Sequence, residues 1–187
     1  AGLNTMAFHI FGRLSGVAPL VGINSGRCFG GNAAILGCCD VVIATKNSSI
    51  GMGGPAMIEG GGLGVFRPEE VGPMDVQVPN GVIDILVADE EEATHAAKQY
   101  LGYFQGPIDD WQEPDQRKLR HLIPENRKRV YDVREVIANL CDEGSVLELR
   151  PNWGVGIVTA FGLVEGRPIG IVANNPHHLA GAVDAAG

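Results

Sequence analysis

The segment that most constrains the fold runs from Val17 to Gly54. An apolar run, Val17–Ile23, is typical of a buried strand. The glycine pair Gly30-Gly31 then precedes a run of small residues, Asn32–Cys39, which favours a closely packed helix. A second strand follows at Val41–Ala44. We therefore predict an α/β unit in which a strand, a glycine turn, a short helix and another strand succeed one another.

The glycine pair lies at the start of the predicted helix, where the first backbone amides have no acceptor within the helix. Glycine has no Cβ to shield these amides, and the helix dipole adds positive potential behind them. Two such amides can hold the oxygen of a polarised carbonyl or of an enolate. Tight packing between the strand and the helix would also require small residues here. The spacing alone leaves both interpretations open.

The residues around this pair, GRCFGGNAAILGCCDVVIATKNSSIG, resemble the oxyanion-hole segment of the crotonase superfamily. Members of that superfamily bind acyl-CoA thioesters and stabilise their enolates on two backbone amides. The resemblance implies that Gly30 and Gly31 carry these catalytic amides, or that one of them does so with a near neighbour. Hydratases of the superfamily have a glutamate where this chain has Ala34. Because hydration needs a carboxylate to move the protons of water, Ala34 argues against a hydratase.

Four sections resemble, in order, the carboxyltransferase component of biotin-dependent acyl-CoA carboxylases, which is built from two crotonase-like domains. They are GRCFGGNAA, IGMGGPAMIEGGGLGVFRPEEVGP, IPENRKRVYDVREVI, and EGRPIGIVANNP followed by LAGAVD. The resemblance implies a crotonase-like ββα spiral and transfer of a carboxyl group from carboxybiotin to the α-carbon of an acyl-CoA. It further implies that the freed biotin nitrogen acts as the base. The implied partners are a biotin carboxyl carrier protein, a biotin carboxylase and further copies of this chain.

The same resemblance places the loop Gly53-Gly54-Pro55 along the acyl-CoA channel. Arg27 is a candidate contact for the phosphates of CoA, and an ordinary surface arginine is an equal alternative. Cys28 has no histidine near it in sequence, so we favour packing over nucleophilic catalysis as its role. The predicted substrate-binding residues are Arg27, Cys28, Phe29, Gly53, Gly54 and Pro55.

A domain boundary is predicted at residues 105–120, where the apolar pattern lapses and prolines and charges accumulate. By the resemblance, residues 1–104 form the C-terminal part of a first crotonase-like domain, which binds acyl-CoA. Residues 121–187 then form the N-terminal part of a second one, which binds carboxybiotin. The resemblance implies a partial chain that holds half of a reaction centre.

Other elements follow from periodicity, capping residues and turn residues. The predicted helices are Leu3–Leu14, Ala56–Glu59, Glu90–Phe104 with Asp89 as its cap, and Asp132 to Cys141, with a short helical turn at Arg67–Glu70. The predicted strands are Val82–Ala88, Val146–Leu149, Val155–Val164 and Ile169–Ala173, the last two joined by a hairpin at Glu165–Pro168.

Composition excludes several classes of function. The chain has 14 basic and 22 acidic residues and a net charge of −8, which disfavours nucleic acid as a partner. It has no uninterrupted apolar run of about 18 residues, so we expect a soluble protein that does not span a membrane. Four cysteines without paired spacing indicate neither a zinc site nor a disulfide framework, and we expect a reducing cytoplasm. Cys38 and Cys39 are predicted to be core residues.

Two groups of side chains invite a metal-site interpretation. The acidic run Asp89–Glu92 is better explained by the positive end of a helix dipole. In the pair His177-His178, neighbouring side chains of an extended chain point to opposite faces, which disfavours shared ligation. The resemblance places this pair near the interface where biotin enters, so we expect a role in subunit contact. We predict no metal site.

Two alternatives to carboxylation remain open. A biotin-dependent acyl-CoA decarboxylase would keep the fold and run the carboxyl transfer in the opposite direction. A noncatalytic fragment or scaffold piece would keep the fold without completing a reaction centre. The sequence does not assign the length of the acyl chain, and it does not fix the direction of transfer.

Overall fold

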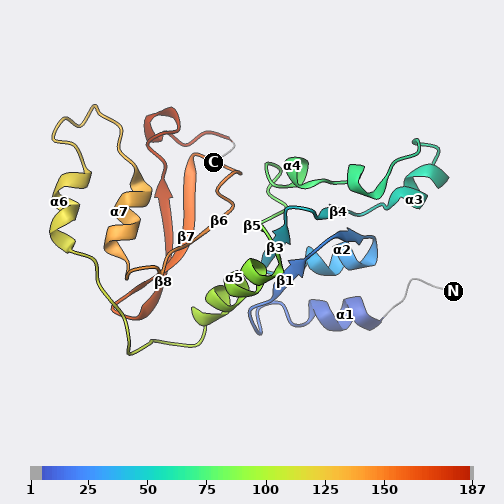
Figure 1. Cartoon of the computed structure of the whole chain (residues 1–187), viewed down its shortest axis with the longest axis horizontal. Coiled ribbons are helices and arrows are strands. Elements are labelled where there is room, and N and C mark those ends of the chain that lie inside the picture. Colours follow the sequence, from blue (N-terminus) through green and yellow to red (C-terminus); the bar gives the residue numbers. More distant parts are fainter. Residues whose placement is uncertain (1–5, 186–187) are drawn as a thin grey trace. The chain divides into compact units, whose positions relative to one another are not determined.

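The computed structural model describes residues 6–185, which form a mixed α/β structure (Figure 1). Contacts within the chain divide it into two compact units, Ala1–Lys98 and Gln99–Gly187. The division falls inside α5 (Glu90–Gly102), shortly before the segment 105–120 that the sequence indicates as a boundary. No helix within residues 6–185 combines the length and the apolar character that a membrane crossing requires.

The first unit contains two parallel sheets whose strands alternate along the chain. One sheet has the order β1 (Val21–Asn24), β3 (Val41–Thr45), β5 (Ile85–Val87). The other pairs β2 (Arg27–Phe29) with β4 (Ser49–Gly51). All five residues of β3 are buried, as expected for the central strand of a parallel sheet covered on both faces.

In chain order, β1 and β2 are followed by one short helix, and β3 and β4 are followed by another. α2 (Gly31–Leu36) follows β2, and α3 (Pro55–Gly60) follows β4. The remaining helical elements of this unit, apart from α5, are α1 (Met6–Gly12), the 3-10 turn η1 (Pro68–Glu70) and α4 (Met74–Gln77). Side chains from both sheets, α2 and α4 form one apolar core: Cys28, Ala33, Leu36, Val42, Ala44, Ile50, Met74, Val78 and Ile83.

Hydrogen bonds between polar groups connect the turn between β1 and β2 with the turn between β3 and β4. The Ser48 hydroxyl donates to the carbonyl oxygen of Asn24 at 2.9 Å and accepts from the amide of Gly26 at 3.2 Å. The Asn24 side chain donates to the carbonyl oxygen of Gly26 at 3.0 Å. Asn24 and Ser48 are buried, and these bonds compensate the loss of water.

The helix α5 begins as the sequence predicts. The Asp89 carboxylate accepts from the amides of Glu91 and Glu92, both at 3.0 Å, and so caps the helix. Directly after the other end of α5, the Tyr103 hydroxyl donates to the carbonyl oxygen of Ser145. The rings of Tyr103 and Phe161 are stacked with their centroids 5.3 Å apart. The second unit begins at Gln99, so it includes the last turn of α5.

The second unit is an antiparallel sheet of β6 (Leu147–Leu149), β7 (Ile157–Val164) and β8 (Arg167–Asn174). α7 (Val133–Leu140), capped by Asp132, buries Val133 and Ile137 in a core with Cys141 and Val158. The other elements are η2 (Gln116–Lys118), α6 (Leu119–Leu122) and η3 (Leu179–Gly181).

The predicted hairpin between β7 and β8 has both turn residues, Glu165 and Gly166, at positive φ. The buried carboxylate of Asp142 accepts from the amides of Glu165 at 3.0 Å and Gly166 at 2.8 Å. The segment 105–120 packs beside this turn, since the amide of Ile108 donates to the carbonyl oxygen of Gly166 at 2.9 Å. Part of this segment therefore has fixed backbone partners in the second unit.

Several sequence predictions need correction. The first strand begins at Val21, and Val17 is 75% exposed. The helix after the glycine pair ends at Leu36, because the chain turns back to enter β3, and this leaves Cys38 exposed and Cys39 half-buried. The strand predicted at Val82–Ala88 is confined to β5. Leu3, in the first predicted helix, lies outside the described residues.

Several short elements escaped prediction, among them β2, β4, α4 and α6. β2 and β4 have three residues each and α4 has four, so they are too short for a periodicity to develop. Their partners come from distant parts of the chain: Cys28 pairs with Ile50 in the parallel register. Such pairing is visible only in the folded protein.

Candidate functional site

The turn between β2 and α2 contains Gly30 in a conformation that only glycine adopts readily, with φ 61° and ψ −128°. Its amide donates to the carbonyl oxygen of Gly51 at 3.3 Å. This bond joins the turn before α2 to the end of β4. Gly30 therefore has a defined structural role in connecting the two strand-helix turns.

The amide of Gly31 is placed differently, at the first position of α2. The first hydrogen bond of this helix runs from the amide of Ala34 to the carbonyl oxygen of Gly30, at 3.1 Å. Within residues 6–185, no backbone acceptor is assigned to the amide of Gly31, as expected at a helix start. The two glycine amides are thus not equivalent: one is hydrogen-bonded within the fold and the other is available.

The surroundings of Gly31 are apolar. A Cβ on residue 31 would lie 3.0 Å from Cζ of Phe8 in α1. Phe8 is 42% exposed, so its ring covers the start of α2 only in part. The sequence of α2, GNAAIL, contains no acidic or basic side chain. Whatever chemistry occurs beside this helix must rely on backbone dipoles or on groups supplied from elsewhere.

The loop predicted to line the substrate channel lies next to this turn. Gly54 precedes α3, whose first residue is Pro55, and a Cβ on Gly54 would lie 3.4 Å from Cβ of Phe29. A Cβ on Gly53 would lie 3.6 Å from the sulfur of Met57. The structure therefore brings Phe29, Gly53, Gly54 and Pro55 together with Gly30, through the pairing of β2 with β4.

Arg27 is engaged in an ion pair. Its guanidinium contacts the carboxylate of Glu69, and the two side chains are 60% and 58% exposed. A hydrogen bond from the backbone of Glu69, followed by the one from Arg27, lowers the pKa of the Glu69 carboxyl. A phosphate that bound Arg27 would have to compete with this carboxylate.

Cys28 points into the core of the first unit and is 7% exposed. Burial raises the pKa of its thiol, which keeps the thiol protonated near neutral pH. A nucleophilic cysteine requires the opposite shift. The geometry therefore favours packing over nucleophilic catalysis at this position.

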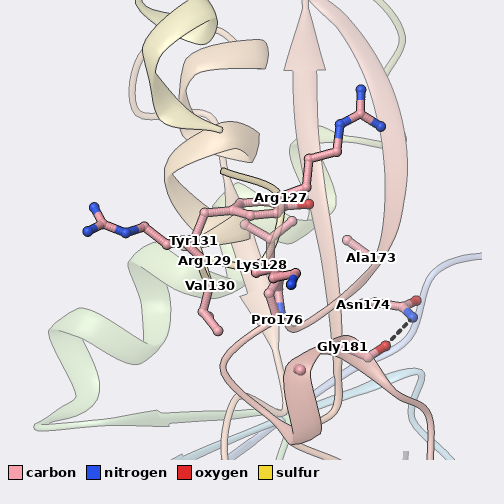
Figure 2. A pocket seen from close by; sticks show the side chains of 11 residues that line it. Arg127, Lys128, Arg129, Val130, Tyr131, Ala173, Asn174, Pro176 and Gly181 are labelled. Carbon is pink, nitrogen blue, oxygen red and sulfur yellow. Dashed lines mark hydrogen bonds between the residues drawn. The ribbon is translucent and has the colours of Figure 1, made fainter. Parts of the chain in front are cut away.

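The second unit carries two adjacent surface pockets, of about 360 Å³ and 430 Å³. Both are lined by Arg127, Arg129 and Tyr131, on the loop that precedes α7. Figure 2 shows the pocket of about 360 Å³. The sequence motifs did not identify Arg127, Arg129 and Tyr131 as a candidate site. The available signal was the density of basic residues in an otherwise acidic chain.

The histidine pair follows β8. The Nε2 atom of His178 lies 3.0 Å from a carboxylate oxygen of Asp184, which ties the end of the described chain back to this turn. Among residues 6–185, no three His, Cys, Asp or Glu side chains are grouped closely enough to hold a metal ion.

Residues 4–186 match the carboxyl transferase domain family, and the chain belongs to this family. The resemblance inferred from the four sequence sections is thereby confirmed.

Individual relatives agree with this assignment. The chain is 32% identical to the methylmalonyl-CoA carboxyltransferase 12S subunit of Propionibacterium freudenreichii subsp. shermanii, over 92% of this chain and 34% of that protein. It is 29% identical to the methylmalonyl-CoA decarboxylase subunit alpha of Veillonella parvula, over 91% of this chain and 36% of that protein. The chain thus spans about a third of the length of these curated relatives.

Solved structures give the same result. A single-chain, multi-domain long-chain acyl-CoA carboxylase aligns with a TM-score of 0.97 and 58% identity, over 100% of this chain and 19% of that one. The transcarboxylase 12S hexamer with hydrolysed methylmalonyl-CoA bound aligns with a TM-score of 0.79 and 32% identity, over 95% of this chain and 36% of that one.

Proposed function

We propose that this chain contributes to the transfer of a carboxyl group from carboxybiotin to the α-carbon of an acyl-CoA. Membership of the carboxyl transferase domain family supports this proposal. The observation that carries it at the level of residues is the available amide of Gly31 at the start of α2. The fold proposed for the first unit is a crotonase-like ββα spiral, in agreement with its alternating strand pairs and helices.

In this function the chain's role is to stabilise negative charge on the thioester oxygen. Loss of the α-proton turns the thioester into an enolate, whose oxygen accepts a hydrogen bond from the amide of Gly31. A neighbouring amide in the first turn of α2 supplies a second donor, because Gly30 already donates to Gly51. Backbone donors fixed in advance stabilise such an oxyanion without having to reorganise.

The lack of an acid or base in α2 fits a reaction in which another molecule supplies the base. Carboxybiotin, when bound, supplies both the carboxyl group and the nitrogen that accepts the α-proton. Residues around Gly30 would then orient the thioester. Phe29, Gly53, Gly54 and Pro55 form the adjacent wall, and the small glycines leave room for a ligand to approach the backbone.

The test is to replace Gly31 by valine in the intact protein and to measure carboxylation of propionyl-CoA. The branched side chain would shield the amide and crowd Phe8. Loss of an oxyanion donor lowers the rate by roughly 100- to 1000-fold. The matched control is Gly60→Ala in α3, where a Cβ meets no atom within 4 Å. An unchanged rate in a folded Gly31→Val protein would refute the role of this amide.

A decarboxylase is the second candidate, because one of the relatives bears that name. The same amide would stabilise the enolate left after carbon dioxide leaves the acyl-CoA. Incubation with methylmalonyl-CoA and with propionyl-CoA, followed by analysis of both thioesters, distinguishes the two directions. A noncatalytic scaffold predicts that neither thioester is converted.

The assembly that this function needs is also a proposal. A biotin carboxyl carrier protein and a biotin carboxylase would deliver the carboxyl group, and copies of this chain would form a homo-oligomer in the cytoplasm. The transcarboxylase 12S relative forms a hexamer, which supports the oligomeric part of this proposal. Size measurement by light scattering tests the oligomer, and co-purification with a biotinylated carrier tests the partner.

A further inference from the structure

The second unit carries an unusual concentration of positive charge. Residues 117–134 contain half of the 14 basic residues of the whole chain: Arg117, Lys118, Arg120, Arg127, Lys128, Arg129 and Arg134. The only acidic residues in the same range are Glu125 and Asp132. Because the chain as a whole has a net charge of −8, an anion is attracted only by such a local excess.

The basic residues in this range differ in whether they are neutralised. Arg117 pairs with Asp115 at 2.8 Å, and Arg134 pairs with Glu148 at 2.6 Å. Arg127, Lys128 and Arg129 make no ion pair with any residue in the described range 6–185. Among the residues that the structure describes, no carboxylate therefore neutralises these three consecutive cations.

The backbone beneath these three cations is held in place. The side-chain oxygen of Asn126 accepts from the amide of Lys128 at 3.0 Å, and its carbonyl oxygen accepts from the amide of Arg129 at 2.9 Å. Tyr131, two residues further on, packs against the core formed by α7 and the sheet. A turn and an anchored ring thus fix both ends of this short basic loop.

The loop lies between two pockets. Arg127, Lys128 and Arg129 line the pocket of about 360 Å³ together with Asn174 at the end of β8. Arg127 and Arg129 also line the pocket of about 430 Å³. The guanidinium groups of Arg127 and Arg129 point to opposite sides of the loop (Figure 2). This arrangement suits an extended ligand with separated anionic groups better than a single small anion.

We propose that the loop Arg127-Lys128-Arg129 binds the phosphate groups of a nucleotide-type ligand. Guanidinium groups donate two parallel hydrogen bonds to phosphate oxygens, and lysine adds a point charge. Both sides of the loop carry a guanidinium, so a diphosphate and a second phosphate of one ligand can each find a partner. The inference concerns residues outside the glycine turn and the first unit, on which the proposed carboxyl transfer rests.

The experiment is calorimetric titration of the intact protein with ADP, CoA, 3′-dephospho-CoA and inorganic phosphate. The test variant replaces Arg127, Lys128 and Arg129 by glutamine. The matched control replaces Arg117, Lys118 and Arg120 by glutamine, which removes the same charge from the same segment outside both pockets. Thermal unfolding followed by circular dichroism checks that both variants are folded.

We expect the test variant to bind the nucleotides at least about tenfold more weakly, because charge-assisted hydrogen bonds are lost. The control should change affinity by less than about threefold, as expected from partly screened charges alone. A preference for CoA over 3′-dephospho-CoA that the test variant loses would identify the 3′-phosphate as a ligand group. Equal binding of ADP and CoA would identify the diphosphate, and either result supports the proposal.

Three results would overturn the inference. They are an absence of measurable binding of every probe by the wild-type protein, an unchanged affinity in the test variant, and an equal loss in the control variant. The second and third outcomes compare two variants in binding alone, so they are distinct from a failure of the proposed function, which is measured as a rate of carboxylation.

Discussion

The amide of Ile50 donates to the carbonyl oxygen of Gly72 at 2.8 Å, while a Cβ on residue 72 would lie 1.8 Å from the carbonyl oxygen of Ile50. Gly72 has φ +62°, so the chain passes against β4 in a conformation that favours glycine. β4 pairs with β2, the strand that leads into the glycine turn. The close contact between these two residues thus fixes a strand on which the candidate site depends.

Gly72→Ala should destabilise the protein strongly. The added methyl group must displace the backbone of Ile50, and the positive φ adds about 1–2 kcal/mol of strain. We expect a total loss of about 3 kcal/mol or more in the free energy of unfolding. Urea denaturation measures this loss.

Gly62→Ala is the matched control for this experiment. Gly62 has φ +69°, and a Cβ there meets no atom within 4 Å. This variant should show the cost of the conformation alone, about 1–2 kcal/mol. Equal losses in the two variants would show that the contact with Ile50 contributes nothing.

Asp142→Asn should weaken the hairpin between β7 and β8. The carboxylate accepts from two backbone amides, whereas an asparagine side chain offers one oxygen and places an NH₂ group against the other amide. An unsatisfied buried donor costs about 1–3 kcal/mol. Hydrogen exchange at Glu165 and Gly166 should also accelerate.

The exposed residue Asp110 provides the comparison for Asp142. Asp110→Asn should change the free energy of unfolding by less than about 0.5 kcal/mol. Slow exchange of both hairpin amides in the Asp142→Asn variant would contradict the importance of this carboxylate.

The four cysteines should differ in their reactivity toward a disulfide reagent. Cys38 is exposed and should react first, while Cys28 and Cys141 are buried and should react only when the protein opens. Burial raises the pKa of both buried thiols, with a smaller contribution from Asp142 at Cys141. Cys38→Ser should remove the fast phase, and a persisting fast phase would contradict the assignment.

The raised thiol pKa values also predict a pH dependence. Above the ordinary thiol pKa of about 8.5, the unfolded chain loses these protons while the folded protein retains them. Stability should therefore fall as the pH rises above this value, and replacement of Cys141 by alanine should reduce the slope. Urea denaturation between neutral and alkaline pH measures this effect.

Motif order in the sequence determined the family, and capping residues determined several elements. Asp89 and Asp132 begin α5 and α7 as predicted, because a carboxylate satisfies the free amides of a helix start within a few residues of the chain. The hairpin was likewise predicted, at Glu165–Pro168, since a tight turn depends on local backbone preferences. The structure narrows its turn to Glu165-Gly166, because Arg167 and Pro168 already belong to β8. These features depend only on residues that are close together in the chain, so they can be predicted from the sequence.

Only the tertiary structure distinguished the two glycines of the candidate site. The sequence presents Gly30 and Gly31 as equivalent, but Gly51 accepts a hydrogen bond from one amide and leaves the other available. The tertiary structure also showed that Arg27 is paired with Glu69, 42 positions away. Within residues 6–185, Arg127, Lys128 and Arg129 have no such carboxylate partner. Hydrogen bonds and ion pairs between distant residues depend on how strands align in space, and no local pattern in the sequence records that alignment.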